Sequence, residues 1–195
     1  MKKLPVYKAV INNDSEGMFV ISFVDSPATE SDWLAFNEDK QPMSFSVENE
    51  EQRIVRGVVM VADTPIYRNN NGYEYYIEYN PETIRFMAQK YFKDGYQNNV
   101  DTNHSFNLEN GVYLQEMFIK DTENGINPKG FEDIKDGSLF AQFKVENDEI
   151  WEQVKDGTFK GFSLAGVFSV EELDEEEQEF RTVVELINKL KDKLK

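Results

Sequence analysis

The chain is organised around the segment Gly157-Thr158-Phe159-Lys160-Gly161-Phe162-Ser163-Leu164-Ala165-Gly166-Val167-Phe168. It places one small hydroxyl, Ser163, in an apolar run that is typical of a buried strand. Gly161 and Gly166 flank the serine at positions where the backbone can approach another part of the molecule closely. A hydroxyl buried in such a strand needs a hydrogen-bond partner. The stretch therefore predicts a strand that presents Ser163 to a partner from elsewhere in the chain.

His104 is the only histidine of the chain, and it lies in the segment Asn99-Val100-Asp101-Thr102-Asn103-His104-Ser105. A serine nucleophile needs a base within hydrogen-bond reach, a third group that orients the base, and donors for the oxyanion. One hypothesis therefore makes Ser163 the nucleophile and His104 the base. The alternative is that Ser163 bonds a nearby backbone carbonyl and that His104 is an ordinary loop residue. Because Ala165 stands two positions after Ser163, the Gly-x-Ser-x-Gly elbow of α/β-hydrolases is absent.

The composition narrows the class of function. A net charge of −16, with 21 Lys and Arg against 37 Asp and Glu, argues against nucleic-acid binding. The absence of cysteine excludes disulfides, thiolate zinc sites and a cysteine nucleophile. A single histidine leaves a metal site to carboxylates, and the acidic run from Glu171 lacks the glycine spacing of a calcium loop, so we expect neither metal nor cofactor. No apolar run is long enough to span a membrane, and a cytosolic setting fits.

Hydrophobic periodicity predicts a β-rich, α+β domain. Two runs at 4–11 and 17–24, separated by turn-forming residues, predict a hairpin. Further strands are expected at 54–62, 73–79, 111–119, 138–145 and 161–168. Asn80-Pro81-Glu82 begins a helix that ends near Gly95 and buries the stripe Ile84, Met87, Ala88 and Tyr91. A second, short helix is expected at 148–155.

The C-terminal part changes character. Residues 171–181 are so acidic that they predict a solvated linker after a domain at 1–170. Residues 182–195 form the third segment, an amphipathic helix whose seam is Val183, Ile187, Leu190 and Leu194. So short a seam is not stable alone, so we expect it to pack on a partner or to self-associate.

Several short motifs, taken in order, resemble the prohead proteases of tailed bacteriophages. They are Asp101-Thr102-Asn103-His104, Gly111 with Glu116-Met117-Phe118-Ile119, Gly137-Ser138-Leu139-Phe140 with Lys144-Val145, and the run from Trp151 to Gly166. The resemblance covers roughly residues 54 to 170. It implies a mostly antiparallel β-barrel flanked by helices, like herpesvirus assemblin, with Ser163 as nucleophile and His104 as base.

The third catalytic residue departs from the pattern that this resemblance implies. Many relatives carry a glutamate or histidine after the serine strand, the glutamate just before a run like Ser-Leu-Val-x-x-Pro-Ala. Here the corresponding run, Ser22-Phe23-Val24-Asp25-Ser26-Pro27-Ala28, lies near the N-terminus, as in a circular permutation, and Val20 takes the place of the glutamate. Asp25 is the first choice for the orienting group, Glu116 the second and Asp101 the third.

The resemblance also implies substrates and a setting. These are the scaffold protein and major capsid protein of the phage, cleaved inside the immature capsid in the host cytoplasm, together with self-cleavage. Some relatives cut after a glutamate preceded two residues earlier by Leu or Ile, and Leu173-Asp174-Glu175 fits that pattern. The alternative is a non-enzymatic capsid-assembly scaffold or adaptor in which His104 and Ser163 are structural. Whether these two side chains meet discriminates between the two classes.

Overall fold

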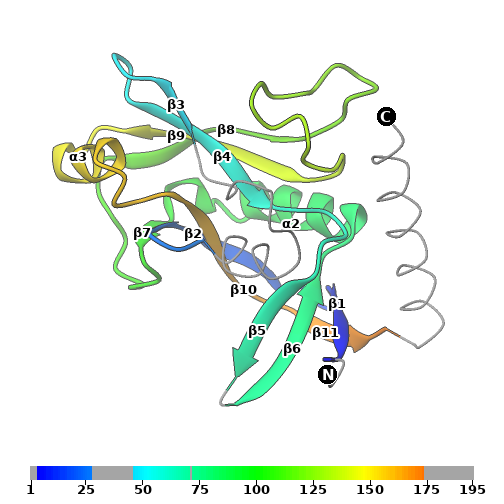
Figure 1. Cartoon of the computed structure of the whole chain (residues 1–195). Coiled ribbons are helices and arrows are strands. Elements are labelled where there is room, and N and C mark those ends of the chain that lie inside the picture. The colour runs from blue at the N-terminus through cyan, green and yellow to red at the C-terminus, as the bar shows by residue number, and fades with distance from the viewer. Residues whose placement is uncertain (1–3, 28–45, 71, 174–195) are drawn as a thin grey trace.

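The computed structural model describes residues 4–27, 46–70 and 72–173, and it is an α+β protein rich in strands (Figure 1). Three sheets organise it. The first has the order β11-β1-β6-β5, the second β10-β2-β7 and the third β3-β4-β9-β8. The strands are β1 Val6–Val10, β2 Gly17–Val24, β3 Ser46–Asn49, β4 Ile54–Met60, β5 Ile66–Asn70, β6 Tyr73–Glu78, β7 Val100–Thr102, β8 Val112–Ile119, β9 Leu139–Val145, β10 Gly161–Val167 and β11 Ser169–Glu172.

The α+β class agrees with the sequence prediction, but the closed barrel was wrong. Within the described residues, each sheet has two edge strands, such as β10 and β7 in the second sheet and β3 and β8 in the third. The pairing is also not purely antiparallel, because β1 runs parallel to β6 and β2 runs parallel to β7. These parallel neighbours come from distant parts of the chain, because parallel strands cannot be joined by a short hairpin turn.

The hairpin predicted from the first two strands was also wrong. β1 pairs with β11 and β6, whereas β2 pairs with β10 and β7. Between them the carboxylate of Glu16 accepts hydrogen bonds from Asn12 N (2.7 Å), Asn13 Nδ2 (3.0 Å) and Ser169 Oγ (2.7 Å). The bond from Ser169 ties this connection to the start of β11, and the other two hold the turn itself.

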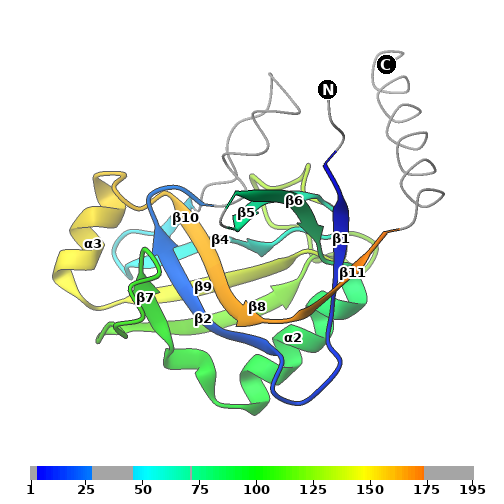
Figure 2. The ribbon, with the colours of Figure 1, turned by 90° about the horizontal axis from the view of Figure 1, so that it is seen from below.

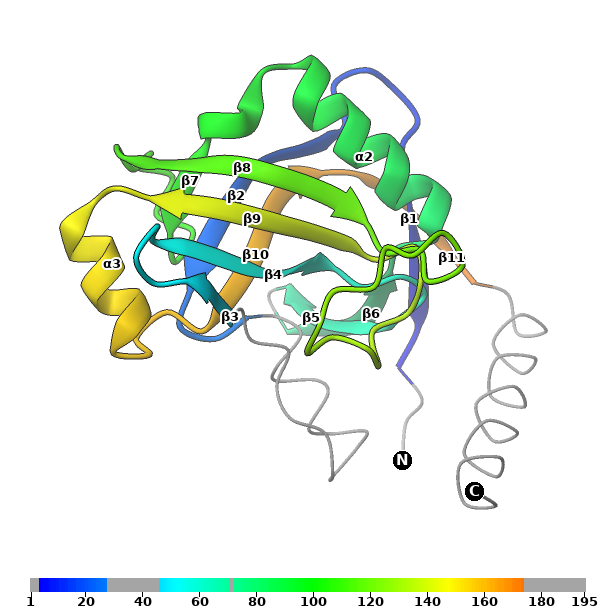
Figure 3. The ribbon, with the colours of Figure 1, turned by 90° about the horizontal axis from the view of Figure 1, so that it is seen from above.

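Both helices that the sequence predicts within the described residues are present, as α2 Pro81–Lys93 and α3 Asp148–Lys155. A 3₁₀ turn, η1 Tyr96–Asn98, follows α2. Asn80 caps α2 by accepting from Thr83 N at 2.7 Å, which satisfies a free N–H of the first turn. The predicted stripe of α2 is buried, and the helix packs against β2 and β9 (Figure 3). These side chains are therefore part of the core.

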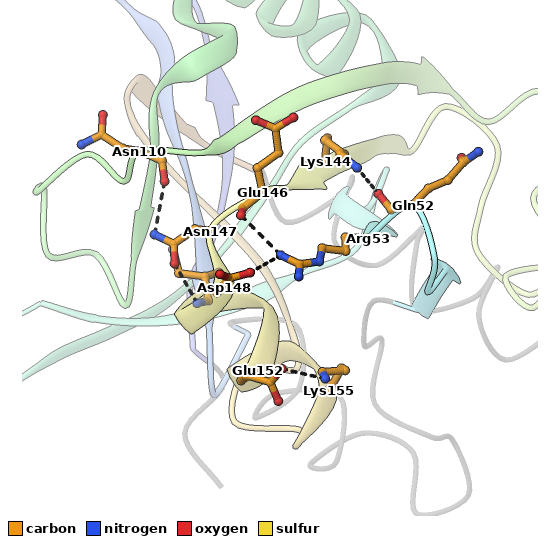
Figure 4. A network of polar contacts seen from close by, with 10 residues as sticks. Gln52, Arg53, Asn110, Lys144, Glu146, Asn147, Asp148, Glu152 and Lys155 are labelled. Carbon is orange, nitrogen blue, oxygen red and sulfur yellow. Dashed lines mark hydrogen bonds and ion pairs between the residues drawn. The ribbon is translucent and has the colours of Figure 1, made fainter.

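α3 delivers the chain into β10, and a polar network holds it against the turn between β3 and β4 (Figure 4). Asn147 Oδ1 caps α3 by accepting from Ile150 N at 3.1 Å. Arg53, at the end of the turn, forms an ion pair with Asp148 at 2.5 Å. The Lys144 ammonium donates to the carbonyl of Gln52. The segment that leads into β10 and Ser163 therefore starts from a helix that these contacts hold in place.

An aromatic cluster packs against one face of the β10-β2-β7 sheet. Phe23 of β2, Phe162 of β10 and Phe143 of β9 lie with ring centroids 5.0 to 5.5 Å apart. Side chains alternate along a strand, so Ser22 and Ser163, adjacent to Phe23 and Phe162, point to the other face. Figure 2 shows β2 running between β7 and β10, across β9. The core thus leaves both serines on the face away from it.

The C-terminal boundaries are only partly described. Glu171 and Glu172, where the sequence predicts the acidic linker to begin, belong to β11 and pair with Lys8 and Tyr7 of β1. The rest of the predicted linker and the predicted helix at 182–195 lie outside the described residues. Among the described helices, none has the length and apolar character needed to cross a membrane.

Candidate active site

Ser163 lies in the middle of β10, directly opposite Ser22 in the antiparallel pairing with β2. Ser22 is in turn the register partner of Asp101 in the parallel pairing of β2 with β7. The approach predicted for Gly166 is confirmed, because a Cβ there would lie 2.6 Å from the carbonyl oxygen of Gly17. This close packing of β10 on β2 holds the two serines side by side.

His104 lies in the loop that follows β7, in a left-handed backbone conformation. Asn103 and His104 have φ values of 48° and 55°, and Phe106 has 57°. Asn and His adopt this region more readily than most residues, but consecutive examples need support from their surroundings. That support comes from Asn103 N, which donates to the carbonyl of Phe23 at 2.9 Å, and from Asp25 N, which donates to Asn103 Oδ1 at 3.1 Å. The loop is thus fastened to the end of β2.

The structure brings the two predicted residues together. His104 Nε2 and Ser163 Oγ lie 2.9 Å apart, and His104 Nδ1 and Ser22 Oγ lie 3.0 Å apart. Ser22 is completely buried, Ser163 is half-buried and His104 is exposed. One imidazole therefore bridges two hydroxyls, with the Ser163 end open to approach from solvent. This is the geometry in which an imidazole can take a proton from a serine.

The structure does not bring the carboxylates expected to orient His104 into contact with the ring. Asp25 is exposed beyond the end of β2, and it is the backbone N–H of this residue that bonds the loop, at Asn103 Oδ1. Glu116 is exposed on β8, in a different sheet, opposite Gln142. Asp101 is buried, and its Oδ2 accepts from Phe106 N at 2.7 Å. Both ring nitrogens of His104 are taken by serines, so the geometry favours Ser22 as the orienting group.

Ser22 was missed in the sequence, although a signal for it was present. It is the one hydroxyl in the run Gly17-Met18-Phe19-Val20-Ile21-Ser22-Phe23-Val24, as Ser163 is in its own run. A polar side chain in a strand buried on both faces needs a partner, and that argument applies equally to both serines. In most serine proteases a carboxylate orients the histidine, and the residue expected in that role was therefore Asp25.

A small hollow of about 20 Å³ lies against β10 beside the site. Phe162, Ser163 and Leu164 form one wall, and Arg68 and Tyr79 are among the residues that face them. The Arg68 guanidinium donates to the carbonyl of Tyr67 at 2.9 Å. Burial raises the pKa of the Tyr79 hydroxyl to about 12, so this phenol stays neutral. Within the described residues, no group of three or more Asp, Glu and His side chains is arranged to hold a metal ion.

Comparison with known proteins agrees with a serine protease. The family model described as "Putative phage serine protease XkdF" matches residues 43–172, a span that includes His104 and Ser163. Because the match covers well over half of the chain, the protein belongs to this family of phage proteases, as the resemblance to prohead proteases predicts.

Two curated relatives come from Bacillus subtilis (strain 168). The phage-like element PBSX protein XkdF is 28% identical over 160 residues, which are 78% of this chain and 53% of that protein. The uncharacterized protein YqbD is 29% identical over 153 residues, which are 75% of this chain and 43% of that protein. The chain thus spans about half the length of the curated relatives that it matches. No solved structure matches it.

Proposed function

We propose that this protein is a serine endopeptidase with Ser163 as nucleophile, His104 as general base and Ser22 as the group that orients the base. The single observation that carries the proposal is the chain of two hydrogen bonds, 2.9 Å from Ser163 to His104 and 3.0 Å from His104 to Ser22. A purely structural serine in a strand would be satisfied by one neighbouring carbonyl. The name of the family supports the same class.

The chemistry follows from these contacts. Ser163 Oγ attacks the carbonyl carbon of the scissile peptide while its proton moves to His104 Nε2. The Nδ1–H group donates to Ser22 Oγ and keeps the ring in place during this transfer. The imidazolium then gives its proton to the leaving amine, and the C–N bond breaks to leave an acyl ester on Ser163. Water attacks the ester, passes a proton to Nε2, and the released serine oxygen recovers it.

As substrates we propose the scaffold protein and the major capsid protein of a tailed phage, and the chain itself. Cleavage would take place inside the immature capsid, in the host cytoplasm. The membership of a phage serine protease family and the resemblance of residues 54 to 170 to prohead proteases support this assignment.

The position of β2 supports a circularly permuted, assemblin-like arrangement. The run Ser22-Phe23-Val24-Asp25-Ser26-Pro27-Ala28 follows the serine strand in relatives but precedes it here. β2, which contains the first three of these residues, is the antiparallel neighbour of β10. A permutation would produce such a strand, which comes earlier in the sequence and still pairs with the serine strand.

The test is co-expression with the scaffold and capsid proteins of the same phage. The wild type is compared with Ser163→Ala and His104→Ala by gel electrophoresis and mass spectrometry. We expect each variant to lose activity by about 10³-fold or more, because nucleophile and base act as one unit. Ser26→Ala is the matched control, since Ser26 is exposed near the end of the same strand as Ser22.

Two results would decide between the enzyme and the adaptor. Cleavage by the wild type and by Ser26→Ala, but not by the two folded site variants, supports the proposed function. A wild type that binds scaffold protein yet leaves it intact supports a non-enzymatic adaptor instead.

A further inference from the structure

Asp101 is a buried carboxylate next to the site, and the proposed mechanism does not use it. Its exposed fraction is 0%. Oδ2 accepts from Phe106 N at 2.7 Å, whereas Oδ1 has no hydrogen-bond partner within the described part of the chain. Leaving a buried acceptor unpaired is costly, especially when the group is charged. An unpaired oxygen at this position therefore needs a physical explanation.

The strand register places this carboxylate in a row with both serines. Asp101 is the partner of Ser22 across β7 and β2, and Ser22 is the partner of Ser163 across β2 and β10. Register partners on neighbouring strands project to the same face of a sheet, and the strands lie about 4.8 Å apart. The side chain of Asp101 is therefore next to that of Ser22, on the side away from Ser163.

The proton positions that catalysis requires leave the hydroxyl hydrogen of Ser22 without an acceptor. For Ser163 to give its proton to Nε2, the neutral imidazole must carry its own proton on Nδ1 and donate it to Ser22 Oγ. The Ser22 hydroxyl then acts as acceptor, and its own hydrogen needs an acceptor in turn. Asp101 Oδ1 needs a donor, and Ser22 is its neighbour in the row. The structure shows no hydrogen bond between the two, so their side chains must turn toward each other to form one.

This inference rests on the proposed function and extends its chemistry by one residue. We propose that Asp101 is a positioning residue that accepts the Ser22 hydroxyl proton and so holds His104 in the Nδ1–H tautomer. Without that acceptor, Ser22 can donate to Nδ1, and the imidazole proton then resides on Nε2. In that tautomer the ring cannot take a proton from Ser163. Asp101 thus acts through Ser22 and has no contact with the substrate.

The bond from Phe106 N to Asp101 Oδ2 also suggests a simpler role, in which Asp101 only shapes the loop that carries His104. The variant Asp101→Asn separates the two roles. Its carbonyl oxygen can still accept from Phe106 N, so the loop is kept. The amide NH₂ then faces Ser22 as a donor, which makes Ser22 donate to His104 and favours the Nε2–H tautomer.

The first measurement needs no variant. Because the chain has one histidine, ¹⁵N NMR of the imidazole reports on His104 without assignment by mutation. At a pH where the ring is neutral, we expect the wild type to show the Nδ1–H tautomer. A wild type with the proton on Nε2 overturns the inference, and this result is available even if Asp101→Asn fails to fold.

The second measurement compares variants in the full chain. Asp101→Asn is set beside Glu109→Gln, which removes a negative charge from the same loop, where Glu109 accepts from Thr102 Oγ1 at 3.2 Å. The readouts are the tautomer and the rate at which a fluorophosphonate labels Ser163, a reaction that forms the Oγ–P bond and releases fluoride. We expect Asp101→Asn to shift the proton to Nε2 and to slow labelling by about 10- to 100-fold. Glu109→Gln should resemble the wild type in both.

The outcomes separate this inference from the proposed function. If Asp101→Asn folds, keeps the Nδ1–H tautomer and labels at the wild-type rate, Asp101 has only a structural role and the inference fails. If Asp101→Asn moves the proton from Nδ1 to Nε2, but the wild type is never labelled at Ser163 and cleaves nothing, the proposed function fails while the link between Asp101 and His104 stands.

Discussion

Ser22 gives His104 a neutral partner where most serine proteases place a carboxylate. A hydroxyl can accept the Nδ1–H bond and so fix the orientation of the ring. It carries no charge, however, and stabilises the imidazolium formed during catalysis less than a carboxylate does. The bond length of 3.0 Å is that of an ordinary neutral hydrogen bond. Orientation is therefore the part of the task that Ser22 can perform alone.

Replacing Ser22 tests this role at the residue scale. We expect Ser22→Ala to fold and to lower the rate of substrate cleavage by about 10- to 100-fold, because Nδ1 loses its acceptor but Ser163 and His104 still meet. Asp25→Asn tests the orienting group that the sequence favoured. Steady-state kinetics on the two variants decide between them. Activity retained in Ser22→Ala and lost in Asp25→Asn would show that the carboxylate orients the ring after all.

The nucleophile and base could be proposed from the sequence because each is conspicuous there. His104 is the only imidazole, and Ser163 is a lone hydroxyl in an apolar run. Ser22 shares that second property, but its role depends on a pairing with β10 across a long stretch of chain. No local pattern encodes which strands pair, so the third residue became visible only with the register.

At the scale of elements, local patterns predicted what forms but not how it pairs. α2 and α3 have capping residues and an apolar stripe, and both formed where expected. The pairing of β1 and β2 depends instead on contacts with β6, β7, β10 and β11, and no turn motif predicts these contacts. β5, β7 and β11 were not predicted at all. β7 is three residues long, too short to show an alternation.

Glu16 offers a pH-dependent test of the connection that separates β1 from β2. The hydrogen bond from the backbone of Asn12, followed by that from Ser169, lowers the pKa of this carboxylate below its usual range. A lowered pKa in the folded state adds stability that is present above the unfolded pKa and is lost as the pH falls through the folded value. We therefore expect Glu16→Gln to be less stable than the wild type at neutral pH and to lose less stability on acidification.

Urea unfolding followed by circular dichroism, from neutral pH into the carboxylate range, measures the effect of Glu16. Asp14→Asn is the matched control, since Asp14 is exposed in the same connection. Its stability should follow the pH dependence of the wild type. An unchanged acid dependence in Glu16→Gln would show that these hydrogen bonds do not stabilise the folded state.

At the scale of the whole molecule, the site is assembled from three distant segments. β2 supplies Ser22, the loop after β7 supplies His104, and β10 supplies Ser163. The family model begins its match at residue 43, so Ser22 and all of β2 lie outside the matched span. Removing β2 would take away the central strand of the β10-β2-β7 sheet as well as the orienting hydroxyl. The N-terminal segment is thus integral to the proposed active site.

The same architecture decides how self-cleavage at Glu175 would proceed. The chain passes from β10 into β11, which leads away from Ser163 and joins the β11-β1-β6-β5 sheet (Figure 2). Leu173 is buried there, and its N–H donates to the carbonyl of Val6 at 2.9 Å. Only two residues, which span at most about 7 Å, separate the paired Leu173 from the peptide bond after Glu175, and this short tether favours cleavage of one copy by another while β11 stays paired.

We therefore expect self-cleavage to occur between copies, at a rate per molecule that rises in proportion to protein concentration. Mass spectrometry over a dilution series should detect a fragment that ends at Glu175. A mixing experiment provides the control: wild type should cut an added Ser163→Ala chain that cannot cut itself, and Glu175→Gln in the Ser163→Ala chain should remove the site. A fragment that forms at the same fractional rate at every concentration would mean that β11 detaches and that the chain cuts itself.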